Sequence, residues 1–354
     1  TSVQVCPPSV ERASPPGRRA ARRICEFAGE IARRVVCCQL AVLAALAAPQ
    51  VRAQAFPSRP IRYIVPVAAG GGSDLVARTT TEAWSRALGQ GFVVENIGGG
   101  GGAIACQTTA KAPADGYTLL QGYVATHGTS PATRSKLPYD AIRDFTPVGM
   151  IGATPNVLVV NASVPVATIA EFVAYLKKTP GAATYGSAGQ GSLTHLTMEL
   201  FKSQIGAFAV HLPYRGIAPA FSDLLGGQTQ AMFPGLAAAL PHIRSGRVRA
   251  LAVTGTQRHP LLKDTPTMIE AGFAGFDAMQ WYGVVAPAGL PAPVLKTLND
   301  TLATTLAAPQ LADKLAAEAV QPQAMTPEAF AAYIREDIAR WTRLAKERKI
   351  ELDN

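Results

Sequence analysis

Two glycine-rich loops, far apart in the chain, carry the residue types that best suit binding of a small anion. Each loop follows a short strand-like segment and precedes a helical run, at residues 66–74 and 186–192. The N-terminus of a helix offers unpaired backbone N–H groups and a partial positive charge. Two such helix ends directed at one cavity would bind a small anion with a charge at each end.

The first loop, at residues 66–74, contains three consecutive glycines, which allow the backbone to turn sharply and to approach a ligand closely. Ser73 or Asp74 can cap the helix that follows. The loop is not a P-loop, because no Gly-Lys-Ser/Thr follows it, and its glycine spacing does not match a dinucleotide fingerprint. It is therefore either an anion contact through backbone N–H groups or a plain strand-to-helix turn.

The second loop, at residues 186–192, mixes glycines with small hydroxyl side chains. Ser187, Ser192 and Thr194 can donate hydrogen bonds to a carboxylate without adding a buried charge. Ser192 is also a candidate N-cap of the helix that follows, and His195 lies just inside that helix. Catalysis by His195 would need a nucleophile and an orienting acid, and the pattern indicates neither. We therefore expect His195 to line the site or to serve the structure.

Three further segments could contribute to the site, and the histidine spacing bears on whether the site binds a metal. Five glycines at residues 98–102 could form a nucleotide cradle, but a flexible connection between strand and helix is favoured. Thr126 and His127 follow one strand, and Tyr214 and Arg215 follow another; Arg215 could pair with a carboxylate or form a surface salt bridge. The five histidines lack the spacing of a metal site. We expect no catalytic residue, no metal and no cofactor.

The elements that must position these loops alternate between strands and helices, which predicts an α/β fold with parallel sheets flanked by helices. From residue 293 to residue 349 the pattern is almost entirely helical, and an apolar stripe on its last helix suggests packing against the body. Helices are expected at 168–178, 294–306, 310–319 and 326–346, and strands at 62–67, 91–95, 117–121, 157–160, 184–186, 208–212, 231–233, 250–254 and 284–286.

The first 55 residues resemble a secretory signal. They hold eight Arg and three Glu, an apolar run at 35–48 and a small-x-small pattern at Ala53 to Ala55, where cleavage is expected. The whole chain of 354 residues has a formal charge of +9, and the rest of it keeps 25 basic and 21 acidic residues without a dense basic cluster. This distribution argues against nucleic-acid binding. Because of the signal-like segment, we expect an exported, periplasmic protein. We also expect it to be a monomer.

Read together, ten stretches between residue 56 and the C-terminus resemble the Bug-type periplasmic solute receptors of the tripartite tricarboxylate transporter family. The matching stretches are 56–61 (FPSRPI), 65–66 with 70–74 (VP and GGGSD), 94–96 (VEN), 113–120 (PADGYTLL), 136–140 (KLPYD), 185–189 (YGSAG), 211–216 (HLPYRG), 223–228 (DLLGGQ), 249–254 (RALAVT) and 266–272 (PTMIEAG).

This resemblance implies a two-lobed, flytrap-like periplasmic-binding-protein fold, with a mostly parallel sheet in each lobe and C-terminal helices on the first lobe. The implied division is a signal peptide at 1–55, a first lobe at 56–155 and 278–354, and a second lobe at 156–277. The implied function is capture of a small organic acid for a membrane permease. Two alternatives stay open: an exported α/β enzyme acting on a small carboxylate, and a ligand sensor that feeds a signalling partner.

The resemblance also implies which residues contact the ligand. Two of these positions depart from the family pattern: Val67 stands where an aromatic residue is usual, and Pro234 stands where an acidic residue is common. Both departures change the chemistry of the expected pocket. The expected ligand contacts are Val67, Ala69, Gly70, Asp74, Thr126, His127, Ser187, Ala188, Gly189, Ser192, Thr194, His195, Tyr214 and Pro234.

Overall fold

The computed structural model describes residues 27–30, 56–70, 72–178 and 180–350. Most of the predicted signal segment, including its cleavage pattern, lies outside these residues; residues 27–30 form a helical turn. In the ranges just given, no helix combines the length and the apolar character needed to cross a bilayer.

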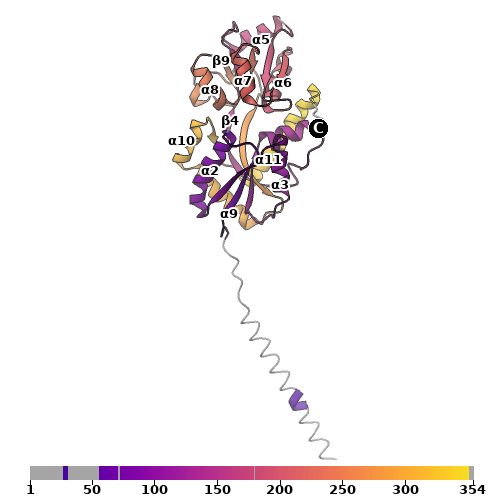
Figure 1. The fold of residues 1–354 in the computed structure, drawn as a ribbon, viewed down its shortest axis with the longest axis vertical. Coiled ribbons are helices and arrows are strands. Elements are labelled where there is room, and N and C mark those ends of the chain that lie inside the picture. The colour runs from indigo at the N-terminus through magenta and orange to yellow at the C-terminus, as the bar shows by residue number, and fades with distance from the viewer. Residues whose placement is uncertain (1–26, 31–55, 71, 179, 351–354) are drawn as a thin grey trace, which may run out of the picture. The chain divides into compact units, whose positions relative to one another are not determined.

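Two sheets organise residues 56–350 (Figure 1). The first sheet has the strand order β11-β4-β10-β3-β1-β2, and the second has the order β7-β6-β8-β5-β9. Strands of the first sheet are β1 (Ile61–Val65), β2 (Phe92–Asn96), β3 (Thr118–Tyr123), β4 (Phe145–Pro155), β10 (Met279–Pro287) and β11 (Gln321–Pro322). Strands of the second are β5 (Val157–Asn161), β6 (Thr184–Ser187), β7 (Val210–Pro213), β8 (Ala231–Met232) and β9 (Val248–Val253).

The prediction of an α/β fold with two sheets is confirmed, but both sheets are mixed rather than mostly parallel. β1 pairs in parallel with β2 and β3, and β6 pairs in parallel with β7 and β8. The remaining pairs, which involve β4, β10 and β11 in one sheet and β5 and β9 in the other, are antiparallel. The chain passes between the sheets from β4 to β5 and from β9 to β10, and all four of these strands are antiparallel to their partners.

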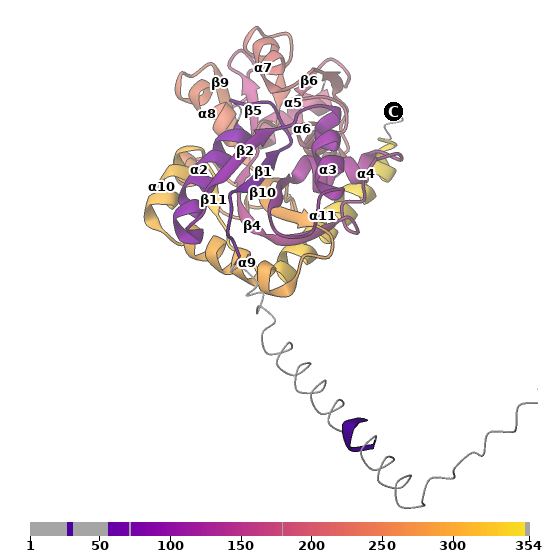
Figure 2. The same cartoon turned by 60° about the horizontal axis from the view of Figure 1, so that its bottom comes forward.

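Helices cover both faces of the first sheet, because its strands are apolar on both sides. On β1, for example, Tyr63 packs in the cluster beneath α2 and α9, and Ile64 packs on the opposite side. Figure 2 shows α3, α4 and α11 as neighbours at one side of this sheet. The helices here are α2 (Gly72–Leu88), α3 (Ala103–Ala110), α4 (Ser130–Thr133), α9 (Ala292–Leu306), α10 (Pro309–Ala317) and α11 (Pro327–Arg348).

Four helices surround the second sheet (Figure 1): α5 (Ile169–Lys178), α6 (Leu193–Ile205), α7 (Ile217–Leu225) and α8 (Leu236–Arg244). α6 is the helix that follows the second glycine loop. Ser192 caps its N-terminus by accepting a hydrogen bond from the His195 N–H, and Gly206 ends it in a left-handed conformation. The predicted cap and the predicted start of this helix are therefore confirmed.

The C-terminal helix α11 packs with its apolar stripe inward, as predicted. Thr326 caps it and Pro327 occupies its first turn, and the side chains of Ile334 and Trp341 are buried. Asp337, also buried, accepts a hydrogen bond of 2.9 Å from the indole N–H of Trp281 on β10. The helix is thus held to the first sheet by both apolar and polar contacts.

The chain passes between the two sheets at Asn156 and again in the segment between β9 and β10. Thr254 joins these two crossings. Its hydroxyl accepts a hydrogen bond of 2.9 Å from the Asn156 N–H and donates one of 2.7 Å to the Ala278 carbonyl. One buried hydroxyl therefore links both crossings. The lobe boundaries given above stay a prediction.

Candidate functional site

The loops predicted to bind the anion lie at the carboxyl ends of parallel strands. In the first sheet, β1, β2 and β3 run parallel, so the segments that follow them share one edge. These segments are the first glycine loop, the five-glycine run and η2 (Ala125–Thr129), a short π-helical turn that contains Thr126 and His127. Ligands of open α/β sheets bind outside this edge.

Asp74 holds the first loop in shape. Its carboxylate accepts hydrogen bonds from the Gly70 N–H at 2.9 Å, from Arg78 Nε at 3.0 Å and from Asn96 Nδ2 at 2.9 Å. Asn96 also donates to the carbonyl of Val67. Burial alone would raise the pKa of Asp74, but these hydrogen bonds and the Arg78 charge outweigh it and hold the pKa below its usual value.

We expect Asp74→Ala to loosen the first loop and to destabilise the fold by about 1–3 kcal/mol, because donors that now reach the carboxylate would lose a charged acceptor. Asp74→Asn is the matched control, since it keeps one acceptor oxygen and the shape of the side chain. Urea unfolding of the two variants measures the difference. Equal stability of the Ala variant and the parent chain would contradict this role of Asp74.

The five-glycine run packs between the first loop and η2. A Cβ placed on Gly102 would lie 2.5 Å from Cγ2 of Thr126 and 3.2 Å from Cβ of Pro66. Gly102 also has a φ of +92°, which L side chains rarely adopt. The run is therefore a connection between strand and helix, as favoured above, and it is also the contact that joins Pro66 to Thr126.

His127 lies behind this edge rather than on its surface. Its ring is fully buried, and its Nδ1 lies 2.9 Å from Oγ1 of Thr126. Burial lowers the pKa of His127 to about 3, so the imidazole is neutral at ordinary pH. Thr126 is buried as well, and its carbonyl accepts a hydrogen bond of 2.7 Å from the Tyr139 hydroxyl. Both side chains hold the backbone of η2 in place.

In the second sheet, the parallel strands β7, β6 and β8 gather the remaining candidates at one edge. Ser187 ends β6, Tyr214 follows β7 and Pro234 lies just beyond β8. The Tyr214 N–H donates to the Ser187 carbonyl at 3.1 Å, and the Tyr214 hydroxyl donates to Asp223 at 2.6 Å. The Pro234 carbonyl accepts from the N–H of Val157 at 2.9 Å, so Pro234 lies beside the first crossing between the sheets.

The second glycine loop uses several of its own N–H groups internally. The Ala188 N–H donates to Thr194 Oγ1 at 2.9 Å, and the Gly189 N–H donates to Ser187 Oγ at 3.1 Å. The Ser192 hydroxyl donates to the Gly189 carbonyl at 2.6 Å. The hydroxyls of Ser187, Ser192 and Thr194, which were expected to donate to a carboxylate, therefore form hydrogen bonds within the loop itself.

Further donors at both loops are the N–H groups in the first turns of α2 and α6. Gly72 and Ser73 begin α2, and Leu193 and Thr194 begin α6, so these four N–H groups have no acceptor within their own helix. Both helix ends also carry the positive end of a helix dipole. These ends are the parts of the two loops best suited to an anion.

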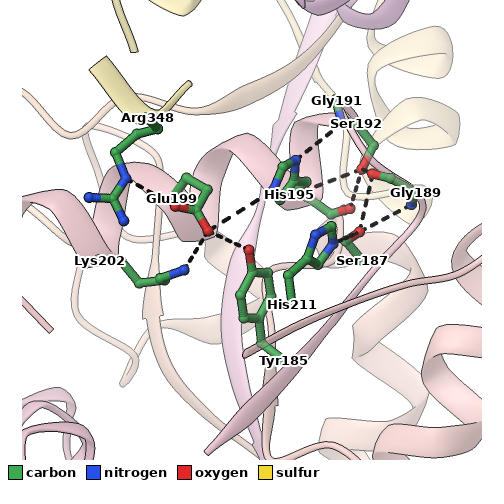
Figure 3. A network of polar contacts seen from close by, with 11 residues as sticks. Tyr185, Ser187, Gly189, Gly191, Ser192, His195, Glu199, Lys202, His211 and Arg348 are labelled. Carbon is green, nitrogen blue, oxygen red and sulfur yellow. Dashed lines mark hydrogen bonds and ion pairs between the residues drawn. The ribbon is translucent and has the colours of Figure 1, made fainter. Parts of the chain in front are cut away.

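A stack of aromatic rings supports the second loop from behind (Figure 3). The rings of His195 and His211 lie parallel with centroids 4.0 Å apart, and His211 stacks on Tyr185 at 4.8 Å. His195 Nδ1 accepts from the Gly191 N–H at 3.1 Å, and His211 Nε2 lies 2.6 Å from Ser187 Oγ. His195 thus serves the structure of the loop, one of the two roles expected for it.

η2, at the edge of the first sheet, lies beside α6, the helix that follows the second glycine loop. Three residues that shape these edges are not among the expected ligand contacts: Asn96, Gly102 and His211. Asn96 belongs to the VEN stretch, but its partners Asp74 and Val67 become neighbours only when β1 and β2 pair. The position of His211 likewise depends on the pairing of β7 with β6.

The comparisons with known proteins agree with this architecture. Residues 76–350 match the family described as the tripartite tricarboxylate transporter family receptor. The chain belongs to this receptor family. A curated relative, Protein BugT of Bordetella pertussis, is 37% identical over 305 residues, which covers 86% of this chain and 93% of BugT.

Two solved structures of similar proteins show the same fold. The periplasmic binding protein BugD has a TM-score of 0.73 and 34% identity and covers 84% of this chain and all of its own. R. palustris Rpa4515, solved with adipate, has a TM-score of 0.75 and 36% identity and covers 82% of this chain and 97% of its own. The predicted membership of the Bug-type receptors and the periplasmic-binding-protein fold are therefore confirmed. Receptors of this family are periplasmic solute-binding proteins, and this chain is accordingly a solute-binding protein.

Proposed function

We propose that this receptor is exported, captures a small carboxylate between the two loop-bearing edges and delivers it to the membrane permease of a tripartite carboxylate transporter. It performs no catalytic step. The observation that carries the proposal is the pair of helix N-termini, on α2 and α6, at the carboxyl edges of the two sheets. Each offers N–H donors and a partial positive charge to an anion.

The titratable side chains near these helix ends leave the backbone N–H groups as the donors for an anionic ligand. The carboxylate of Asp74 already has three hydrogen-bond donors, and Asp223 accepts from the Tyr214 hydroxyl. His127 and His195, which are buried, and His211, which is partly buried, have pKa values lowered by desolvation and are neutral. A bound carboxylate would therefore be held by N–H donors and not by a buried charged side chain.

Such a site suits a receptor that must release its ligand. Hydrogen bonds from N–H groups to a carboxylate contribute roughly 1.5–3 kcal/mol each. Four or five of them, less the cost of ordering, give dissociation constants of about micromolar or below. We propose a dicarboxylate, because two positive helix ends complement two carboxylates, and because the related Rpa4515 was solved with adipate.

A thermal-shift screen of residues 56–354 against mono-, di- and tricarboxylates tests this function. A dicarboxylate at a hundredfold excess over its dissociation constant should stabilise the fold by about 2.7 kcal/mol. Calorimetry then measures the affinity, and chromatography of the recovered ligand checks that it is unchanged. Turnover of the ligand would point to the enzyme alternative, and no stabilisation by any carboxylate would contradict the proposal.

A further inference from the structure

A buried charged cluster lies on α6 one turn beyond His195, whose Nε2 is 4.0 Å from Oε1 of Glu199, and the proposed function does not use it. Its centre is Glu199, whose side chain is only 8% exposed. One carboxylate oxygen, Oε1, accepts from the Tyr185 hydroxyl at 2.6 Å and from Lys202 Nζ at 2.5 Å. The other, Oε2, accepts from Arg348 Nε at 3.1 Å. Figure 3 shows these residues converging on the carboxylate.

The three donors come from three different elements. Tyr185 belongs to β6, Lys202 lies one turn further along α6, and Arg348 belongs to the last turn of α11. Burial alone would raise the pKa of Glu199, but the hydrogen bonds from Lys202 and Tyr185 outweigh it and keep the pKa below its usual value. A buried carboxylate with this set of donors is ionised and fixed in position.

Arg348 is the connection from this cluster to the first sheet. The body of α11 is held there by the hydrogen bond between Asp337 and Trp281, and by Phe330, which packs directly over Gly283 of β10. α6, in contrast, flanks the second sheet. The ion pair between Arg348 and Glu199 therefore ties an element anchored on one sheet to an element anchored on the other.

The cluster is also connected to the glycine loop. The Tyr185 ring stacks on His211, and His211 stacks on His195. These two histidines contact the loop at both ends: His211 through the Ser187 hydroxyl and His195 through the Gly191 N–H. A shift of Tyr185 or of α6 would move both of these contacts together.

We propose that Glu199 is a positioning residue and that its ion pair with Arg348 couples the C-terminal helix to the geometry of the second glycine loop. While the pair is formed, α6 and the stacked rings hold the loop in one conformation. When α11 and α6 move apart, the loop loses this support and its donors become less well placed for an anion. The C-terminal helix thereby senses, and sets, the state of the binding edge.

Amide hydrogen exchange of the ligand-free protein tests this coupling directly. Arg348→Gln should raise the exchange rate of the Gly191 amide about tenfold, because one charged hydrogen bond to Glu199 is lost, while the Ile64 amide on β1 stays unchanged. Arg343→Gln is the matched control, since Arg343 is an exposed arginine of the same helix. Arg348→Lys keeps the positive charge and should return the Gly191 rate to within about threefold of the parent chain.

The proposal is overturned if Arg348→Gln leaves Gly191 exchange at the level of Arg343→Gln. It is also overturned if exchange at Ile64 rises as much as at Gly191, because that result would mean a general loss of stability. Affinity for adipate is a second readout that rests on the proposed function: Arg348→Gln should weaken it about tenfold. A parent chain that binds no carboxylate would count against the proposed function alone, and the exchange rates would still decide the coupling.

Discussion

Gly102→Ala is expected to be among the most damaging single substitutions in this receptor, for both stability and ligand binding. The new methyl group would meet Cγ2 of Thr126 at 2.5 Å and Cβ of Pro66 at 3.2 Å, and the residue would have to keep a φ of +92°. A left-handed backbone costs an L residue roughly 1–2 kcal/mol, and overpacking costs a further 1–3 kcal/mol. We expect a total loss of about 3 kcal/mol in the free energy of unfolding.

The effect on binding should be larger than the loss of stability alone suggests, because Pro66 leads into the first glycine loop and Thr126 belongs to η2. Displacing either one would misplace N–H donors, and we expect affinity for a dicarboxylate to fall more than about tenfold. Gly98→Ala in the same run is the control, since its Cβ would meet only ordinary contacts, the nearest at 3.5 Å from the Ala68 nitrogen. Urea unfolding and calorimetry compare the two; similar behaviour of both variants would refute the role assigned to Gly102.

Acid is expected to unfold this receptor at a higher pH than it would if its histidines were exposed and kept their ordinary pKa. Burial lowers the pKa of His195 to about 4 and of His211 and His127 to about 3, from an ordinary value of 6.5. Between pH 6.5 and these values the unfolded chain takes up protons that the folded chain does not. Stability is therefore fully present above about pH 6.5 and falls as the pH decreases, by on the order of 3 kcal/mol per histidine once the pH reaches about 4.

Urea unfolding at pH 7.5, 6, 5 and 4.5 measures this loss of stability. NMR titration of the imidazole C2 protons gives the pKa of each histidine and so shows which of them causes the loss. Gln at position 211 would remove one titrating ring, so His211→Gln should shift the acid midpoint to lower pH. A free energy of unfolding that stays constant from pH 7.5 to pH 5 would contradict the burial argument. So would a folded His195 that titrates near 6.5.

The sequence predicted the elements around the site well, because strand, glycine turn and helix follow one another there without interruption. Both glycine loops, the cap at Ser192 and the C-terminal helices lie where the pattern placed them. β4 was not predicted, because Pro147, Gly149 and Gly152 read as strand breakers. In the structure Gly152 is required by packing: a Cβ there would lie 2.4 Å from the Gln321 carbonyl oxygen.

The orientation of the site side chains could not be predicted from the sequence. Ser187, Ser192 and Thr194 are hydroxyl residues in a loop, and local rules allow them to face a ligand or their own backbone. Only the pairing of β6 with β7 reveals that His211 lies beside Ser187, and only the folded loop shows that Thr194 Oγ1 accepts from the Ala188 N–H. Contacts that depend on sheet pairing or on the fit of α6 against α11 have no local sequence signal.

An NMR titration of the backbone amides with adipate tests the central claim most directly. If two helix ends hold the anion, the amides of Ser73 on α2 and of Leu193 and Thr194 on α6 should shift together with one dissociation constant. Shifts confined to one of the two helices, or shifts that occur only at residues remote from both, would contradict the claim that the two edges grip a single carboxylate ligand.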